Sequence, residues 1–107
     1  MFEVLRYQAE DGTQPFTEWL ESVRDKAAMA RLRVRLRRLE AGLLGDCEPV
    51  GFGVLELREH RGAGYRIYFG RHGRTVVILL TGGTKRTQVK DIEAAKAFWA
   101  DWKRRSP

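Results

Sequence analysis

The sequence predicts an α+β protein, and three observations support that class. Apolar residues recur three and four positions apart in two N-terminal segments and near the C-terminus, as in amphipathic helices. They alternate with polar residues between positions 54 and 70, as in strands. Glycine-containing breaks separate these segments. The expected order is β-α-α-β-β-β-α: an N-terminal strand and a helix hairpin packed on an antiparallel sheet, with a C-terminal helix.

The N-terminal half supplies the first strand and both helices of the hairpin. Residues 2–7 form a short apolar strand, and Thr13 can cap a helix whose first turn contains Pro15. A second helix is expected over about residues 26–43, and its apolar stripe consists of Met29, Leu32, Leu36, Leu39 and Leu43. Because the link between the helices is short, they are expected to lie antiparallel.

Three strands are expected to follow a loop over residues 45–53. Residues 54–60 and 65–70 alternate, so that Arg58 and His60 point to the same side of the first strand. Residues 75–81 are apolar on both faces, which is typical of a central strand, and Gly82-Gly83 is expected to end it. Asp91 is expected to cap the last helix.

Length and composition narrow the class of protein. The 107 residues are expected to form a single domain, residues 1–107, with one core. One cysteine, Cys47, excludes an intramolecular disulfide and a cysteine-rich zinc site. The sequence shows neither an apolar run of membrane-spanning length nor a signal-peptide pattern. A cytoplasmic protein without a membrane partner is therefore expected.

The charge distribution points to a polyanionic partner. The net charge is +6, but residues 1–25 carry −4 and the remainder carries +10. Between Arg58 and Lys90, eight basic residues accompany one acid, Glu59. Several of these cations lie in strands, where a charge must point away from the core. A sheet bearing outward arginines, followed by a glycine-rich basic loop, suits nucleic acid best.

Arg58 and Arg66 are the first candidate catalytic residues. Each lies one position from core-facing residues in neighbouring strands, so both are expected on the open face of the sheet. Two adjacent guanidinium groups repel unless an anion bridges them, and a phosphate matches the arginine fork. The alternative is that these arginines only pair with Glu56 or Glu59 on a solvated face.

The loop after the third of these strands adds two more candidates. Gly82-Gly83-Thr84 can bring backbone N–H groups close to a phosphate, and Lys85 and Arg86 follow directly. Lys85 is a candidate catalytic residue, and the expected nucleic-acid-binding cations are Arg61, Arg86 and Lys90. The Walker A spacing is absent. The alternative is a basic loop without a ligand.

Tyr68 and His60 complete the candidate site. Tyr68 shares the face of Arg66 and is expected to stack on a base, whereas Tyr65 belongs to the core. His60 shares the face of Arg58, beside cations, and is a candidate general acid or base. The alternative for His60 is an ordinary surface histidine at the end of a strand.

Five arginines on the second helix lie mostly off its apolar stripe: Arg31, Arg33, Arg35, Arg37 and Arg38. They are expected to form a solvated face whose long stems shield the core. The alternative is contact with a nucleic-acid backbone or with an acidic segment of a partner.

No metal or cofactor is expected. The sequence lacks paired carboxylates at metal-ligand spacing, a Ser/His/Asp arrangement, a His-x-x-x-His motif and a dinucleotide fingerprint. RNA can be cleaved without a metal because its 2′-hydroxyl is an internal nucleophile. Such cleavage requires in-line positioning, charge neutralisation and proton transfer.

Several segments together resemble a known family. They are Thr13 to Leu20, Leu55-Glu56-Leu57-Arg58, Gly64-Tyr65-Arg66-Ile67-Tyr68-Phe69, Leu79 to Gln88, Asp91-Ile92 and Ala95-Lys96. In order and spacing they resemble the phage-derived, "addiction module killer" branch of the RelE/ParE toxin superfamily, close to the RelE-like and HigB-like members. The likeness covers nearly the whole chain.

The resemblance implies a fold, an activity and a partner. The fold is a helix hairpin packed on an antiparallel sheet, and the activity is that of the toxin in a type II toxin–antitoxin pair. RelE-like members cleave mRNA without a metal, usually in the ribosomal A site. The partner is a small antitoxin, often a helix-turn-helix protein from the same operon, that covers the basic face.

The resemblance also assigns residues. Arg66 matches the strand arginine that contacts the scissile phosphate, and Arg58, Lys85 and Arg86 match basic positions of this branch. The C-terminal tyrosine of RelE has no counterpart, because the last helix carries Phe98, Trp99 and Trp102 instead. The acidic and histidine tail of HigB-like relatives has no counterpart either. Two alternatives therefore stay open: a ParE-like inhibitor of DNA gyrase, and a non-catalytic module that binds nucleic acid or an antitoxin.

Overall fold

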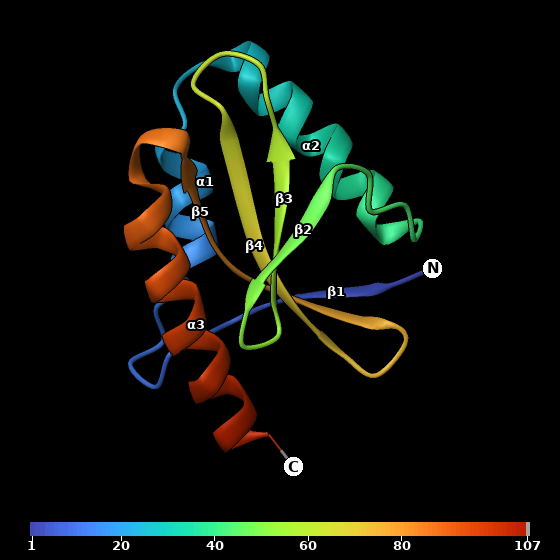
Figure 1. Cartoon of the computed structure of the whole chain (residues 1–107), viewed down its shortest axis with the longest axis vertical. Helices are drawn as coiled ribbons and strands as arrows, with labels where there is room; N and C mark the ends of the chain where they lie inside the picture. Colours follow the sequence, from blue (N-terminus) through green and yellow to red (C-terminus); the bar gives the residue numbers. More distant parts are fainter. Residues whose placement is uncertain (107) are drawn as a thin grey trace.

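A five-stranded mixed sheet with helices on both faces is the frame of the protein (Figure 1). The computed structural model describes residues 1–106. The elements are β1 (Glu3–Arg6), α1 (Pro15–Ser22), α2 (Lys26–Glu40), β2 (Cys47–Gly51), β3 (Val54–Glu59), β4 (Tyr65–His72), β5 (Val76–Thr84), the 3₁₀ turn η1 (Lys85–Thr87) and α3 (Gln88–Arg105). The predicted α+β class is confirmed.

The strands are arranged in the order β1-β5-β4-β3-β2. The pairs β2–β3, β3–β4 and β4–β5 are antiparallel, as short connections require. β1 instead pairs parallel with β5, with Glu3 opposite Val76. The prediction of a wholly antiparallel sheet was therefore wrong. β1 pairs with the last strand of the chain, and the intervening elements allow both strands to run in the same direction.

The strand β2 lies where the sequence predicted a loop. It is a short edge strand paired with β3, and its ladder is irregular between Pro49 and Gly51. Proline has no N–H for a ladder, so sheets tolerate it at an edge or a bulge. Because β2 contains a proline and a glycine in only five residues, it shows no alternation of apolar and polar residues from which a strand could be predicted.

α1 begins at Pro15 and α2 begins at Lys26, as the sequence predicted, but α2 ends at Glu40 instead of near Leu43. Asp25 caps α2 by accepting hydrogen bonds from the N–H groups of Ala27 and Ala28. Thr13 does not cap α1, because its N–H and hydroxyl both donate to Asp11 Oδ1. α3 begins at Gln88 rather than at Asp91, since η1 leads directly into it.

Gly82 does not end the third of the predicted strands. β5 continues through Gly82 and Gly83 to Thr84, and Gly82 is buried. A Cβ atom at Gly82 would overlap the ring of Trp19, so the absence of a side chain lets α1 pack closely against the sheet. Gly82 therefore serves packing within the strand instead of ending it.

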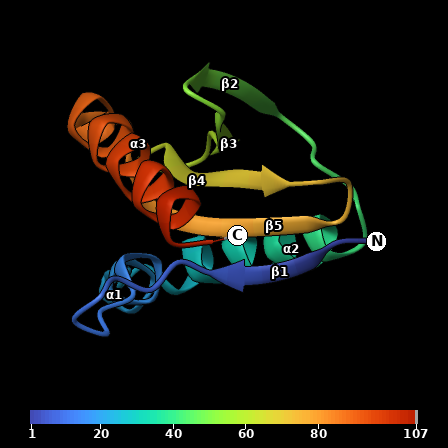
Figure 2. The ribbon, with the colours of Figure 1, turned by 90° about the horizontal axis from the view of Figure 1, so that it is seen from below.

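The two faces of the sheet carry separate cores (Figure 2). α1 and α2 cover one face, and we call the apolar residues there the α1/α2-side core: Phe16, Leu32, Leu39, Leu57, Ile67, Phe69, Val77 and Leu79. α3 packs across β5 and β4 on the other face. The α3-side core consists of Tyr7, Val54, Tyr68, Ile78, Leu80, Ala95 and Trp99. The face predicted to be open is therefore partly covered by the last helix.

Candidate functional site

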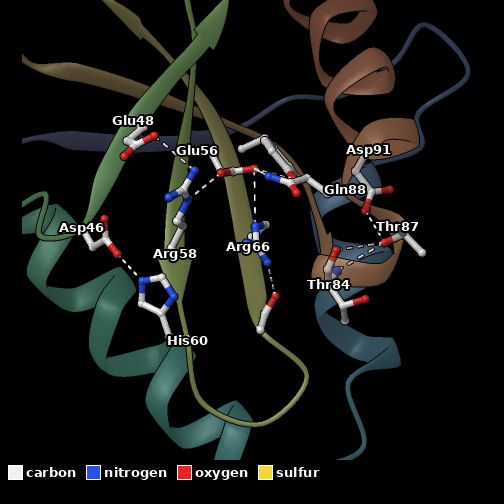
Figure 3. A network of polar contacts seen from close by, with 12 residues as sticks. Asp46, Glu48, Glu56, Arg58, His60, Arg66, Thr84, Thr87, Gln88 and Asp91 are labelled. Atoms are coloured by element: carbon white, nitrogen blue, oxygen red, sulfur yellow. Dashed lines mark hydrogen bonds and ion pairs between the residues drawn. The ribbon is translucent and has the colours of Figure 1, made fainter.

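Arg58 and Arg66 lie directly opposite each other on β3 and β4. Alternation places both on the face that α3 covers, and Figure 3 shows their side chains side by side near the start of that helix. The prediction that they are neighbours on one face is confirmed, and the structure adds their register. We call Glu56, Arg58, Arg66, Lys85 and Gln88 the two-arginine site.

Glu56 holds the two-arginine site together. Its side chain is fully buried. It accepts hydrogen bonds from Arg58 Nε at 2.8 Å, from the Tyr68 hydroxyl at 2.9 Å and from Gln88 Nε2 at 2.9 Å (Figure 3). Arg66 Nε lies 3.6 Å from the same carboxylate. An anion placed between two guanidinium groups removes much of their repulsion.

The environment of Glu56 keeps it ionised. Burial by itself would raise its pKa, but the hydrogen bonds from Arg58, Gln88 and Tyr68 lower it, and the net effect is a pKa below the usual value. A buried carboxylate that is paired and fully hydrogen-bonded is stable as the anion. Glu56 therefore cancels part of the positive charge that the sequence had led us to expect.

One nitrogen of the Arg66 guanidinium makes a hydrogen bond, and another has no hydrogen-bond partner within residues 1–106. Its Nη1 donates to the Gly64 carbonyl at 2.8 Å, and only 8% of the residue is exposed. Its Nε is buried and has no hydrogen-bond partner within 3.5 Å among the described residues. The Nε faces the Glu56 carboxylate at 3.6 Å, so the buried guanidinium is held by an ion pair with Glu56 in addition to its bond with Gly64.

Arg58 is more exposed than Arg66 and is more fully paired. Its Nη2 reaches Glu48 on β2 at 3.2 Å, in addition to its bond with Glu56. The pairing with Glu56 that was the alternative from the sequence is thus present. Glu59 is not a partner of Arg58, and its carboxylate lies 3.8 Å from Arg31 Nε instead.

Lys85 extends the two-arginine site toward solvent. A Cβ at Gly64 would lie 3.3 Å from both Lys85 Cβ and Arg66 Nη1, so the two cationic residues flank the same glycine. The Lys85 N–H also donates to the Ala63 carbonyl at 3.4 Å. Lys85, which the sequence placed after the glycine-rich segment, therefore begins its side chain next to Gly64 and Arg66. It reaches that place as the first residue of η1 rather than in an irregular loop.

Arg86 and Lys90 lie in η1 and in the first turns of α3, and both are exposed. They are therefore on the same segment as Lys85. Arg61 is different, because it is exposed on the turn between β3 and β4 and lines a hollow beside α2. The structure thus separates Arg61 from the two-arginine site.

Tyr68 cannot stack on a base in this structure. The residue is fully buried in the α3-side core, and its hydroxyl donates to Glu56. Burial first, and then the bond to the Glu56 carboxylate, raise the pKa of Tyr68, so the phenol stays protonated. The stacking prediction was wrong because alternation gives the face of a residue and says nothing about the helix that covers that face.

His60 is exposed and pairs with an acid. Its Nε2 contacts Asp46 Oδ2, from the segment before β2 (Figure 3). The hydrogen bond from His60 is the main reason that the pKa of Asp46 is lowered. The sequence had placed this ring among cations only, and it missed the carboxylate because Asp46 is 14 positions away in a segment predicted to be a loop.

Two residues of the site were not assigned from the sequence. Glu56 had been considered only as an ion-pair partner, although its place on the face of Arg58 was readable from alternation. Gln88 gave no signal, because it was placed in a loop before the expected helix start. Its bond to Glu56 links the beginning of α3 to the middle of β3.

The described residues also answer two questions about accessory groups. In residues 1–106, no three His, Cys, Asp or Glu side chains are grouped so that they would hold a metal ion. Over the same range, no helix combines the length and apolar character needed to cross a membrane.

The fold and the site define a small α+β protein with paired arginines around a buried glutamate. No family model matches the chain. The chain is 43% identical over 84 residues to an uncharacterized protein of Haemophilus influenzae (strain Rd), and the alignment covers 78% of this chain and 85% of the relative. The chain belongs to the same family as that protein.

Proposed function

We propose that this protein is the toxin of a type II toxin–antitoxin pair, from the RelE/ParE superfamily, and that it cleaves mRNA on translating ribosomes. The sequence resemblance motivates the family. The observation that carries the activity is the opposed pair Arg58 and Arg66 on one face of the sheet, with the exposed Lys85 beside Gly64 at the end of β5. A phosphodiester is an anionic acceptor whose oxygens match the arginine fork.

The chemistry would use the RNA's own hydroxyl. The 2′-oxygen attacks the adjacent phosphorus, the bond to the 5′-oxygen breaks, and a 2′,3′-cyclic phosphate and a free 5′-hydroxyl result. Arg66 and Lys85 would stabilise the charge that develops on the phosphoryl oxygens, and Arg58 would hold the flanking phosphate. The 2′-hydroxyl loses a proton and the 5′-oxygen gains one. His60, with its partner Asp46, is the candidate for these transfers.

Expression of the chain alone is expected to arrest growth and to cut transcripts within translated codons. Primer extension on translated mRNA measures the cuts. Arg66→Ala is expected to abolish both effects with an unchanged circular dichroism spectrum. Arg74→Ala, at an exposed arginine in the turn between β4 and β5, removes the same charge away from the site and should keep them. A fully active Arg66→Ala protein would remove the central residue from the proposal.

One observation favours the ParE-like alternative, in which the same fold inhibits DNA gyrase. Tyr68 and Glu56 flank Arg66, and both are fully buried, so neither reaches a substrate hydroxyl. Growth arrest with intact mRNA and loss of DNA supercoiling would support gyrase inhibition. The absence of any growth effect would support a binding module without catalysis.

The proposed partner is an antitoxin encoded beside this chain. The basic residues around Arg66 and Lys85 suit a partner that neutralises them. A short adjacent reading frame encoding a helix-turn-helix protein is the expected genetic context. Co-expression of that product should restore growth, and a persistent arrest would contradict this assignment.

A further inference from the structure

A second group of arginines gathers beside α2, away from the face that α3 covers. Arg31, Arg35 and Arg38 are spaced four and three residues apart, so they share one side of the helix. Arg61, on the turn between β3 and β4, meets them across a hollow of about 320 Å³ that is also lined by Val34 and Glu59. A second hollow of about 600 Å³ shares Arg35, Arg38 and Glu59 with the first. We call the two together the α2 groove.

Arg35 fixes the walls of the α2 groove. Its guanidinium donates to the carbonyl oxygen of Arg58, and it reaches the carbonyls of Leu44 at 3.5 Å and Asp46 at 3.4 Å. These bonds tie α2 to the end of β3 and to the segment that enters β2. Arg35 is therefore a structural residue that holds α2 and the segment before β2 together on the two sides of the groove.

The other cations of the groove are less satisfied. Arg31 Nε is buried and has no hydrogen-bond partner within 3.5 Å among the described residues, and its nearest carboxylate, Glu59, lies 3.8 Å away. Arg38 and Arg61 are exposed. In the described part of the chain, only Arg31 Nε and Arg66 Nε are buried side-chain donors of this kind. One lies in the α2 groove and the other in the two-arginine site.

The turn between β3 and β4 connects these two places. On one side, a Cβ at Gly62 would lie 3.8 Å from Arg31 Nη2. On the other side, the Ala63 carbonyl accepts the Lys85 N–H, and Gly64 lies against Lys85 and Arg66. The exposed Arg61 is on the turn itself. An extended polymer that repeats its negative charge can contact both groups of cations at once.

We propose that the α2 groove binds the phosphodiester backbone of RNA, as a continuation of the two-arginine site. This inference rests on the proposed RNA substrate and adds a second contact region to it. The guanidinium fork matches phosphate oxygens bidentately, and the exposed Arg38 and Arg61 can present this fork to the backbone. Messenger RNA and ribosomal RNA share this backbone chemistry. An acidic protein segment is the competing occupant.

The test is equilibrium binding of a labelled 20-nucleotide single-stranded RNA, measured by fluorescence anisotropy at several salt concentrations. Arg38→Gln/Arg61→Gln removes two exposed cations of the groove, and Arg33→Gln/Arg37→Gln removes two exposed cations of the same helix outside it. Each lost phosphate contact on a single strand lowers the salt slope by about 0.7. The groove variant is therefore expected to lose about 1.4 units of slope and to bind at least tenfold more weakly at low salt. The matched control should stay near the wild type.

Equal weakening of the two double variants would show a general charge effect and would overturn the inference, as would a groove variant that binds like the wild type. Because the readout is binding, it is independent of cleavage. If the wild-type protein cuts no mRNA but binds RNA through the groove, the proposed cleavage activity is contradicted, whereas the inferred RNA binding is supported.

Two further arms identify the source of the anion. Isolated small ribosomal subunits without mRNA should show the same difference between the double variants if ribosomal RNA fills the groove. The difference should appear only with the 20-nucleotide strand if messenger RNA fills it. Poly-L-glutamate is the competitor for the protein alternative. Groove-dependent binding of poly-L-glutamate that matches the binding of RNA would assign the groove to an acidic protein segment and overturn the RNA proposal.

Discussion

The two sides of β4 meet opposite environments. Ile67 and Phe69 point into the α1/α2-side core, which is apolar. Arg66 and Tyr68, which alternate with them, point toward α3 and the Glu56 carboxylate. The face with Ile67 and Phe69 therefore stabilises the fold by removing apolar surface from water. The face with Arg66 instead buries charged groups, which are stable there only when they are paired. Apolar residues in place of a buried ion pair are often neutral or stabilising, so stability alone does not explain the charges on the polar face of β4.

The largest effect is expected on the apolar face. Phe69→Ala should lower the free energy of unfolding by about 3–5 kcal/mol, because it leaves a cavity in the α1/α2-side core. Urea denaturation measures the loss. RNA binding per folded molecule should not change, since Phe69 points away from Arg66. A loss below about 1 kcal/mol would show that this face is not the stabilising one.

A smaller loss of stability is expected from Glu56→Gln. The amide keeps the shape of the side chain but removes the charge that pairs with Arg58 and Arg66, and the expected cost is about 1–3 kcal/mol. Glu48→Gln is the matched control, because Glu48 pairs with the same Arg58 from an exposed position and should change stability by about 0.5 kcal/mol or less. If urea denaturation gave equal losses of stability for the two substitutions, Glu56 would contribute no more to the fold than the exposed Glu48.

Tyr68→Phe tests the contribution of a single hydrogen bond on the polar face of β4. It removes one hydrogen bond to Glu56 and leaves the packing of the ring intact, so the expected cost is about 0.5–1.5 kcal/mol. The chemical denaturation midpoint should fall with no change of slope. A more stable variant would mean that the buried hydroxyl is not well satisfied by Glu56.

The smallest expected effect is the contribution of Glu56 to acid unfolding. The pKa of Glu56 is lowered in the folded state, so its stabilisation is fully present above the unfolded value of 4.5 and is lost as the pH falls through the folded pKa. In urea titrations between pH 5 and pH 2, the wild type should therefore lose stability more steeply than Glu56→Gln. Parallel curves would show that Glu56 has the same pKa in both states.

Alternation was sufficient to predict the arrangement of β3 and β4. It put Arg58 and Arg66 on one face and Ile67 and Phe69 on the other, because successive side chains in a strand point to opposite sides. The sequence also named Lys85 as a candidate at the end of the last strand, but its place beside Gly64 and Arg66 came from the structure. The alternation of residues along each strand was therefore enough to predict that the candidate site contains both Arg58 and Arg66.

The missing parts depend on contacts between distant segments. The sequence does not state that β1 pairs with β5, that α3 covers Tyr68, or that Asp46 meets His60. Gly82 was taken as a strand end because glycine usually interrupts a strand, whereas here it makes room for Trp19. Each of these errors arose where tertiary packing overrides a local preference.

The pairing of β1 with β5 sets the order in which the nascent chain can mature. The first strand has no partner until residues 76–79 have been synthesised. Closing so long a loop costs more entropy than forming a hairpin, and pairing at this separation slows folding. Gln88 emerges later still, and only then can its amide anchor Glu56. Most of the polypeptide must therefore be made before the guanidinium groups are locked into place, so truncated translation products would lack the assembled centre.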